Sequence, residues 1–201
     1  MAETELKKSR GRPKTLDRAR TLNLAMESYW DEGVHCISLN EICRRADVSK
    51  PGLYREFGGE DGLMVAVLDH YIATVFAPLV ELIQSDRPFA DVLHDVVEAI
   101  TQDKDAPAGC MAAKMRSTAS ALGPLTKARL KRFHEECVEV YEGWIGRAQR
   151  REEVDPAIAT ELAASYLDTQ LTTILTQVAS GEDTLMIRAK AELAFRALKF
   201  T

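Results

Sequence analysis

Apolar residues recur along this chain three or four positions apart, which is the spacing of an amphipathic helix. A clear example lies between residues 89 and 100, where the apolar members are Phe89, Val92, Leu93, Val96, Val97 and Ile100. Residues at this spacing share one face of a helix, so each such stripe predicts a helix with one buried side. No segment shows the strict apolar and polar alternation of a half-buried strand. The pattern therefore predicts an all-α protein.

Cap residues and helix breakers divide this pattern into about nine helices. Gly33 and Gly123 are expected to end helices, and Asp155 with Pro156 is expected to begin one. Pro78 falls inside the long fourth helix, where its ring and its missing N–H predict a kink. The expected helices span about residues 17–32, 38–46, 49–57, 60–85, 88–100, 109–121, 124–151, 155–180 and 184–201.

Between residues 38 and 57 the pattern predicts two short helices joined by a tight turn. Ser38 is followed three residues later by Glu41, the capping-box pair that satisfies the free amides at a helix start. Asp47 suits the turn, because aspartate tolerates left-handed backbone conformations. Ser49 can cap the second helix. This is the geometry of a helix-turn-helix unit, in which the second helix enters the DNA major groove.

The second helix of this unit would present polar side chains to DNA. Lys50 and Tyr54 are expected to contact phosphates, whereas Arg55 is the better candidate for a base edge. Arg44, on the preceding helix, should add a contact to the DNA backbone. The candidate DNA-binding residues are Arg12, Lys14, Ser38, Arg44, Ser49, Lys50, Pro51, Gly52, Tyr54 and Arg55.

Two successive amphipathic helices also occur in proteins that bind no DNA. The charge of the neighbouring residues distinguishes a DNA-binding unit from an ordinary pair of helices. Between Lys7 and Arg20 the chain carries seven Lys or Arg side chains and the single acid Asp17. A basic segment next to a helix-turn-helix unit can neutralise DNA phosphates. Because the whole chain has a formal net charge of -5, we expect nucleic-acid binding only at this end. The expected organisation is a basic arm at residues 1–15 and a DNA-binding domain at residues 16–60.

Five short motifs follow one another in this part of the chain. They are GRPK at 11–14, YWDEG at 29–33, SLNEIC at 38–43, RADVSKPGLYREFGG at 45–59 and DGLMVAVLD at 61–69. In order and spacing they resemble the TetR/AcrR family of bacterial regulators. The resemblance implies a three-helix DNA-binding head, a helical effector-binding and dimerisation body at residues 61–201, and repression relieved by a small molecule. Family members often have Gly at the position of Asp47 and Lys at that of Glu60, so no phosphate contact is carried over to residue 60.

The last two predicted helices carry apolar residues on more than one face. A helix that is apolar nearly all round needs cover on both sides. A second subunit can supply that cover, and other helices of the same chain are the alternative. The resemblance favours a homodimer through these two helices, which also suits a palindromic operator of double-stranded DNA. A charge at Ile174 or Leu175 is then expected to disrupt the interface or the core.

The central helices contribute aromatic and sulfur-containing side chains that could line an apolar cavity for a small-molecule effector. Plain core packing is the alternative for each of them, and the effector itself cannot be named from the sequence. Arg116 could hold a carboxylate through two guanidinium nitrogens. The candidate ligand-binding residues are Phe76, Phe89, Met111, Met115, Arg116, Phe133, His134, Tyr141, Trp144, Tyr166 and Gln170.

A covalent trigger is the alternative to a bound effector. Cys110 follows Gly109 at the expected start of a helix, where the helix dipole favours a reactive thiolate. Against this, a buried cysteine usually behaves as an inert apolar residue. The chain is therefore either a regulator that binds a small molecule or a sensor of oxidants and electrophiles.

Neither a catalytic nor a metal site is expected, and no cofactor is implied. The sequence has no GxSxG, phosphate-loop or paired-carboxylate pattern, which leaves an all-helical enzyme as a remote alternative. His134 and Cys137 lie one helical turn apart, but no second pair of metal ligands accompanies them. The four cysteines form no CxxC pair, and neither a signal peptide nor a run of about 18 apolar residues is present. We therefore expect a cytoplasmic protein with reduced thiols and no membrane contact.

Overall fold

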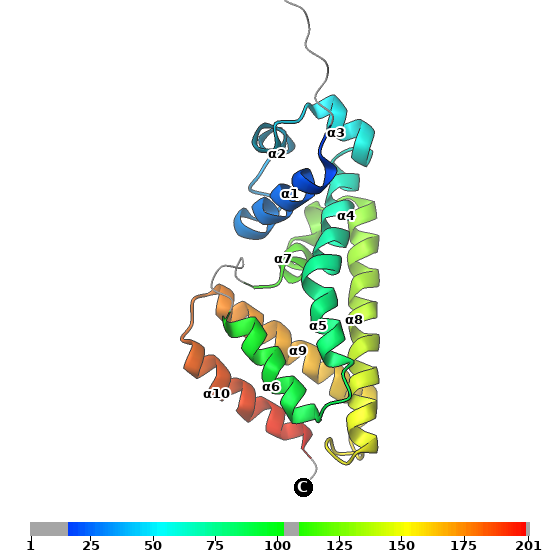
Figure 1. Ribbon diagram of the computed structural model, residues 1–201, viewed down its shortest axis with the longest axis vertical. Helices are drawn as coiled ribbons and strands as arrows, with labels where there is room; N and C mark the ends of the chain where they lie inside the picture. The colour runs from blue at the N-terminus through cyan, green and yellow to red at the C-terminus, as the bar shows by residue number, and fades with distance from the viewer. Residues whose placement is uncertain (1–15, 103–108, 200–201) are drawn as a thin grey trace, which may run out of the picture.

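The computed structural model describes residues 16–102 and 109–199, and all regular structure in these ranges is helical (Figure 1). The expected basic arm at residues 1–15 lies outside the described residues. Because α4, η1 and α5 form one continuous rod, the described elements amount to nine helices, and the predicted all-α class is confirmed. In chain order the elements are α1 (Arg18–Glu32), α2 (Leu39–Ala46), α3 (Lys50–Phe57), α4 (Glu60–Tyr71), η1 (Ile72–Phe76), α5 (Ala77–Ile83), α6 (Phe89–Gln102), α7 (Met111–Ser117), η2 (Ala119–Ala121), α8 (Pro124–Arg150), α9 (Thr160–Ala179), α10 (Thr184–Phe195) and η3 (Arg196–Leu198).

Helices α1, α2 and α3 lie together at one end of the molecule and are called the head (Figure 1). Ala25 of α1, Ile42 of α2 and Leu53 of α3 are completely buried, as their positions in the apolar stripes predict. Burial of such side chains is the main favourable term that holds a small helical unit together. An ion pair between Arg45 of α2 and Glu32 of α1 adds a polar link between two of the helices.

The helices that follow the rod, α6 to α10, are called the body. The rod α4–η1–α5 leads from the head along this body (Figure 1). The kink predicted at Pro78 takes the form of a π-helical segment, η1, in the turn just before it. There the N–H of Ala77 donates to the carbonyl of Ile72, one residue further back than in an α-helix. Because the ring of Pro78 crowds the preceding turn and Pro78 donates no hydrogen bond, a widened turn is the expected response.

The 24-residue span Glu60–Ile83 is long and apolar enough to cross a membrane by length and composition, with a mean hydropathy of 1.8. In the fold, Leu63, Val67 and Leu68 of this span are completely buried, and α4 packs against α1, α3 and α8. Only 28% of the 18-residue apolar stretch within this span is buried, in part because other residues of the span border the cavity described below. The absence of membrane contact therefore stays a prediction.

The body is built around α8, the longest helix, which runs beside the rod (Figure 1). Helix α9 packs against α8, and α6 and α10 pack against α9. The buried side chains of α8 recur three or four residues apart, as expected for a helix with one interior face. They include Leu130, Phe133, Cys137, Tyr141, Trp144 and Ala148.

Two predicted helix boundaries are wrong. The helix expected from residue 155 begins at Thr160, because Asp155 accepts a hydrogen bond from the N–H of Ala157 (2.8 Å) and closes a separate turn. In the segment 109–121, α7 already ends at Ser117, and the short 3-10 helix η2 follows after a break. In the first case a side chain bonds to the backbone locally and so competes with the helix ladder.

The start of α8 is capped by a residue of α4. The carboxylate of Asp61 accepts hydrogen bonds from the N–H groups of Leu125 (2.9 Å) and Thr126 (3.0 Å), and from the Thr126 hydroxyl (2.6 Å). Gly123 makes room for this approach, since a Cβ there would lie 2.2 Å from Cγ of Asp61. These bonds satisfy amides that a helix start leaves free, and they join the rod to the body close to the head.

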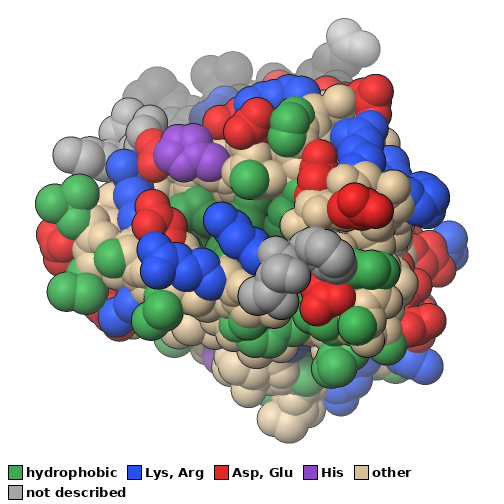
Figure 2. Space-filling model, turned by 90° about the horizontal axis from the view of Figure 1, so that it is seen from below, with side chains coloured by type: hydrophobic (Ala, Val, Ile, Leu, Met, Phe, Trp, Pro, Cys, Tyr) green, Lys and Arg blue, Asp and Glu red, His purple; other side chains and the backbone are tan. Residues whose placement is uncertain are grey.

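A hollow of about 540 Å³ lies between α6 and α10 at the lower end of the body. Seen from below, green apolar surface in the hollow is surrounded by basic and acidic side chains (Figure 2). Arg188 of α10 pairs with Glu98 of α6 (2.9 Å) beside it. Phe89, a predicted ligand residue, borders this hollow.

Candidate DNA-binding face and ligand cavity

The turn between α2 and α3 has the geometry that the sequence predicts. Oγ of Ser38 accepts a hydrogen bond from the N–H of Glu41 (3.2 Å), and Oγ of Ser49 accepts one from the N–H of Gly52 (3.2 Å). Asp47 ends α2 in the left-handed region, with a φ of 56°. Both helix starts are therefore held by local side-chain caps.

Only half of the predicted capping box forms. In the described structure the carboxylate of Glu41 binds Arg44 (2.6 Å) and Arg45 (2.8 Å) rather than the N–H of Ser38. Hydrogen bonds from Arg44 and then from Arg45 lower the pKa of Glu41 to about 2. Arg44, an expected DNA contact, is thus already ion-paired, although its side chain is 73% exposed.

Most candidate DNA-binding residues are exposed. Lys50, Tyr54 and Arg55 project from α3, which lies at the outer end of the head (Figure 1), and Nζ of Lys50 lies 5.8 Å from the centroid of the Tyr54 ring. An exposed helix that carries an ammonium, a phenol and a guanidinium group at one end of the molecule is able to enter a major groove. The other described candidates are Ser38, Arg44, Ser49 and Pro51, which are exposed, and Gly52, which is half-buried, while Arg12 and Lys14 lie outside the described residues.

A cavity of about 470 Å³ lies where the head meets the body. Trp30 of α1 borders it together with residues from the rod, α6, α7, α8 and α9. The volume falls within the range of small-molecule sites, about 300–1,000 Å³. The larger part of its wall is apolar and includes Phe76, Leu79, Leu82, Leu171, Leu175 and Val178.

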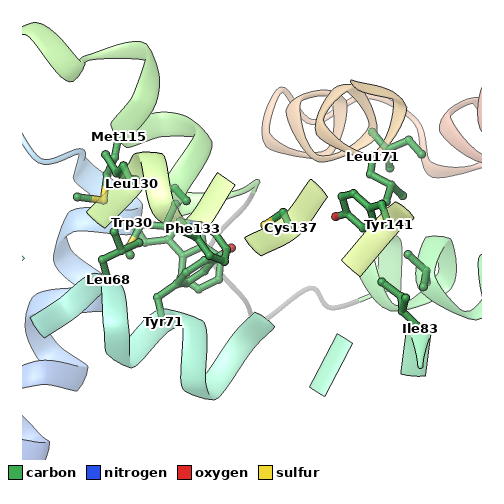
Figure 3. Close-up of a cluster of buried hydrophobic side chains, with 14 of the residues drawn as sticks. Trp30, Leu68, Tyr71, Ile83, Met115, Leu130, Phe133, Cys137, Tyr141 and Leu171 are labelled. Atoms are coloured by element: carbon green, nitrogen blue, oxygen red, sulfur yellow. The ribbon is translucent and has the colours of Figure 1, made fainter. Parts of the chain in front are cut away.

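Four of the predicted ligand residues border this cavity, namely Phe76, Arg116, Phe133 and Tyr141. The rings of Phe76 and Phe133 pack edge to face with their centroids 4.9 Å apart. Figure 3 shows Phe133 and Tyr141 on the same side of α8, with Cys137 between them. Phe133, Cys137 and Tyr141 follow one another at intervals of four residues, which is the signal by which the sequence could place them together.

The other predicted ligand residues do not border the cavity. Trp144 packs on Phe89 with the ring centroids 4.8 Å apart, and the hydroxyl of Tyr166 donates to a backbone carbonyl of α10 (2.8 Å). A helical stripe identifies a buried face, but it does not tell whether another side chain or an open space lies opposite. The residues placed away from the cavity are Phe89, Met111, Met115, His134, Trp144, Tyr166 and Gln170.

Arg116 and Asp168 bring opposite charges to the cavity wall. Nη1 of Arg116 donates to Nδ1 of His134 (3.0 Å), and Oδ2 of Asp168 lies 4.0 Å from the same nitrogen. Because arginine can only donate, Nδ1 of His134 acts as the acceptor. Sequence reasoning missed Asp168, and its one signal was an acid inside a buried apolar stripe of α9. Among the described residues, no group of three or more His, Cys, Asp or Glu is arranged to hold a metal ion.

Trp30 connects the head to the cavity and was also missed. Its Nε1 donates to the carbonyl of Gly109 (2.9 Å), and its own carbonyl accepts a hydrogen bond from Nζ of Lys114 (2.9 Å). Its ring packs edge to face on Tyr71 with a centroid separation of 5.0 Å. The hydroxyl of Tyr71 donates in turn to Sγ of Cys110 (3.5 Å). Trp30 therefore belongs to the head and also borders the cavity.

The outer surface of α9 and α10 exposes large apolar side chains. They are Leu162 (64% exposed) on α9, and Leu185 (75%), Met186 (54%) and Leu193 (69%) on α10. Ile174 is buried within its own chain and Leu175 borders the cavity, so of the two predicted effects of a charge there, disruption of the core is the one that this packing favours.

Comparisons with known proteins agree with this geometry. The family model for "Bacterial regulatory proteins, tetR family" matches residues 22–67. The HTH-type transcriptional repressor ComR of Escherichia coli (strain K12) is 32% identical over 167 residues, which cover 81% of this chain and 80% of ComR.

Solved structures share the fold. One is a cysteine mutant of the TetR family transcriptional regulator CifR complexed with 26bp double-strand operator DNA, with a TM-score of 0.78 and 23% identity over 94% of this chain and 100% of the other. Another is the reduced form of Escherichia coli NemR, with a TM-score of 0.79 and 16% identity over 92% of this chain and 98% of the other. The chain belongs to the TetR family of DNA-binding transcriptional regulators, because it has the helix-turn-helix head, matches the family model and is similar to ComR.

Proposed function

We propose that the protein is a homodimeric, cytoplasmic repressor that leaves a palindromic operator when a small molecule fills the cavity. The observation that carries this proposal is the position of Trp30, which belongs to a helix of the head and also borders the cavity. A molecule bound there touches the DNA-binding part of the chain directly. The relative ComR is named a transcriptional repressor, which supports negative regulation.

In this mechanism the ligand acts on the spacing of the two heads. The heads of a dimer must lie roughly 34–36 Å apart to reach successive major grooves. A ligand that presses on Trp30 and on Phe76 of η1 favours a different head position, so ligand and DNA oppose each other's binding. A coupling of about 1–3 kcal/mol corresponds to a 5–150-fold change in operator affinity.

The head would bind DNA through α3. Lys50 and Tyr54 contact phosphates, and Arg55 reads a base edge in the major groove. Arg12 and Lys14 of the arm add attraction to phosphates without sequence preference.

Binding of the effector to free and operator-bound dimer tests the proposal. Gel shifts with DNA from upstream of the protein's own gene, run with fractionated small-molecule extracts, identify the effector. Calorimetry should then show weaker effector binding to the DNA complex than to the free dimer, and equal affinities would rule the mechanism out.

A matched pair of tryptophan variants sharpens the test. Trp30→Phe removes the hydrogen bond to Gly109 but keeps an aromatic ring, so it should bind operator and respond less to the effector. Trp144→Phe is the control, because Trp144 is buried in the body away from the cavity. An unchanged effector response in Trp30→Phe would contradict the role given to this residue.

A thiol trigger at Cys110 is the second candidate. Cys110 borders the cavity, where an oxidant or electrophile could reach it, and its Sγ accepts hydrogen bonds from the Tyr71 hydroxyl (3.5 Å) and the N–H of Ala113 (3.4 Å). Mass spectrometry after mild peroxide treatment, compared with operator release in wild type and Cys110→Ser, separates the two triggers. Release that requires modified Cys110 would favour the thiol.

A further inference from the structure

The cavity has a large apolar part and a small polar part, and the polar part indicates which ligands it accepts. We infer that its ligand is a neutral, largely apolar molecule with one hydrogen-bond-accepting group, such as a carbonyl, that binds the hydroxyl of Tyr141. The inference rests on the proposed function, since it names the chemical class of the effector for the same cavity.

Tyr141 supplies the first observation. The residue is only 5% exposed, yet it borders the cavity, and within the described chain its hydroxyl has no hydrogen-bond partner. Figure 3 shows this hydroxyl pointing along α8 toward Cys137. Unlike the hydroxyl of Tyr29, that of Tyr141 is not sealed from solvent. An acceptor placed in the cavity would give it a hydrogen bond that no described residue supplies. In contrast, the hydroxyl of Tyr166 already donates to the carbonyl of Ala194 (2.8 Å).

Protonation decides which partner Tyr141 needs. Burial, followed by the nearby Cys137 and Asp168, raises the pKa of the Tyr141 phenol well above its ordinary value. The hydroxyl therefore keeps its hydrogen at neutral pH and donates it. A ligand acceptor is the partner that takes up this hydrogen.

The charges on the wall exclude a charged ligand. Arg116 and Asp168 both border the cavity, and their formal charges cancel. An anionic ligand would be drawn to Arg116 but repelled by Asp168, and a cationic ligand would meet the reverse. Neither ligand meets a net opposite charge on the wall, so nothing offsets the loss of its hydration in a mostly apolar space. A neutral molecule avoids that cost.

Three naphthalenes of nearly equal size distinguish these classes. They are 2-acetylnaphthalene (a neutral acceptor), 2-naphthoate (an anion) and 2-ethylnaphthalene (no acceptor). Calorimetry with the full-length dimer, without DNA, should rank the ketone as the tightest ligand. Tyr141→Phe should weaken the ketone by about 3- to 10-fold, the worth of one net hydrogen bond, and leave the hydrocarbon unchanged.

The infrared carbonyl band of bound 2-acetylnaphthalene gives a second readout. It should shift to lower frequency in wild type and in the control Tyr166→Phe, and not in Tyr141→Phe. Three outcomes would overturn the inference. The first is that 2-naphthoate binds most tightly and loses affinity in Arg116→Gln. The others are that Tyr141→Phe and wild type bind the ketone equally, or that none of the three compounds binds.

The same probes separate this inference from the proposed function. If the ketone binds through Tyr141 but no cavity ligand changes operator affinity, the chemical class is supported and the repressor mechanism fails. If an anionic effector releases the operator, the repressor mechanism stands and the neutral class is wrong.

Discussion

Single polar side chains join the rod to the body. Asp61 of α4 caps α8 through three hydrogen bonds, and Arg129 of α8 pairs with Asp69 of α4 (2.6 Å). Removing one partner of such a bond leaves the other unsatisfied, which costs more than the bond itself contributes. These positions are therefore expected to be sensitive to substitution, although none of them is a candidate for contact with DNA or ligand.

Asp61→Asn tests the cap through its pH dependence. Partial burial raises the pKa of Asp61, but hydrogen bonds from the Thr126 hydroxyl and from the N–H groups of Leu125 and Thr126 lower it below the ordinary value. A carboxylate with a lowered pKa stabilises the fold above its unfolded pKa of about 3.9, and this contribution is lost as the pH falls. Urea unfolding should show Asp61→Asn about 0.5–1.5 kcal/mol less stable than wild type at pH 7, because its NH2 group cannot accept the hydrogen bond that one carboxylate oxygen accepts. The difference should shrink below about pH 4, and a constant difference would refute the cap.

Arg55→Ala and Tyr54→Ala test the two modes of DNA contact. Loss of a base contact at Arg55 should cost about 1–3 kcal/mol of operator affinity and relax sequence preference, whereas loss of a phosphate contact at Tyr54 should weaken all sequences alike. Gel-shift titrations on operator and scrambled DNA measure both effects. Arg150→Ala, an exposed arginine at the far end of α8, is the matched control. Wild-type affinity in both head variants would rule out the assignment.

Local signals predict most helices, and the exceptions have local causes. Ser38 and Ser49 cap α2 and α3 as expected, because a cap depends on residues two or three positions away. The start of α9 was missed because Asp155 bonds its own turn. The π-helical form of η1 was missed because Pro78 predicts a disturbance of the helix but not its type.

Deleting residues 1–14 tests the basic arm. Each lost phosphate contact lowers the slope of log affinity against log salt by roughly one. The truncated protein should therefore bind operator more weakly and with a flatter salt dependence, while its circular dichroism stays the same. An identical salt slope would show that the arm makes no phosphate contacts.

At the scale of the whole molecule, large apolar side chains of α9 and α10 stay exposed in the described part of the chain. Leu162, Leu185, Met186 and Leu193 lie on the surface of α9 and α10. Exposed apolar groups of this kind mark association surfaces when they occur together. A second copy related by a two-fold axis would bury them and set the distance between the heads.

Leu193→Glu tests this dimer. Wild type should sediment at twice the mass of one chain, and a charge at Leu193 should shift it toward the monomer, because an unpaired charge is costly to bury. Leu125→Glu is the control, since Leu125 is similarly exposed (60%) but lies at the start of α8. A wild-type monomer at micromolar concentration, or a dimer unaffected by Leu193→Glu, would contradict the proposed interface.

The sequence by itself determined the helices, the helix-turn-helix unit and the exposed positions of α3. These features depend on residues within about four positions of one another, where caps and stripes act. The tertiary structure decided which side chains meet at the cavity. Trp30, Arg116, Tyr141 and Asp168 come from four different helices, and no local pattern relates them. It also decided that Ile174 packs inside its own chain, because burial depends on which helices cover a stripe and not on the stripe alone.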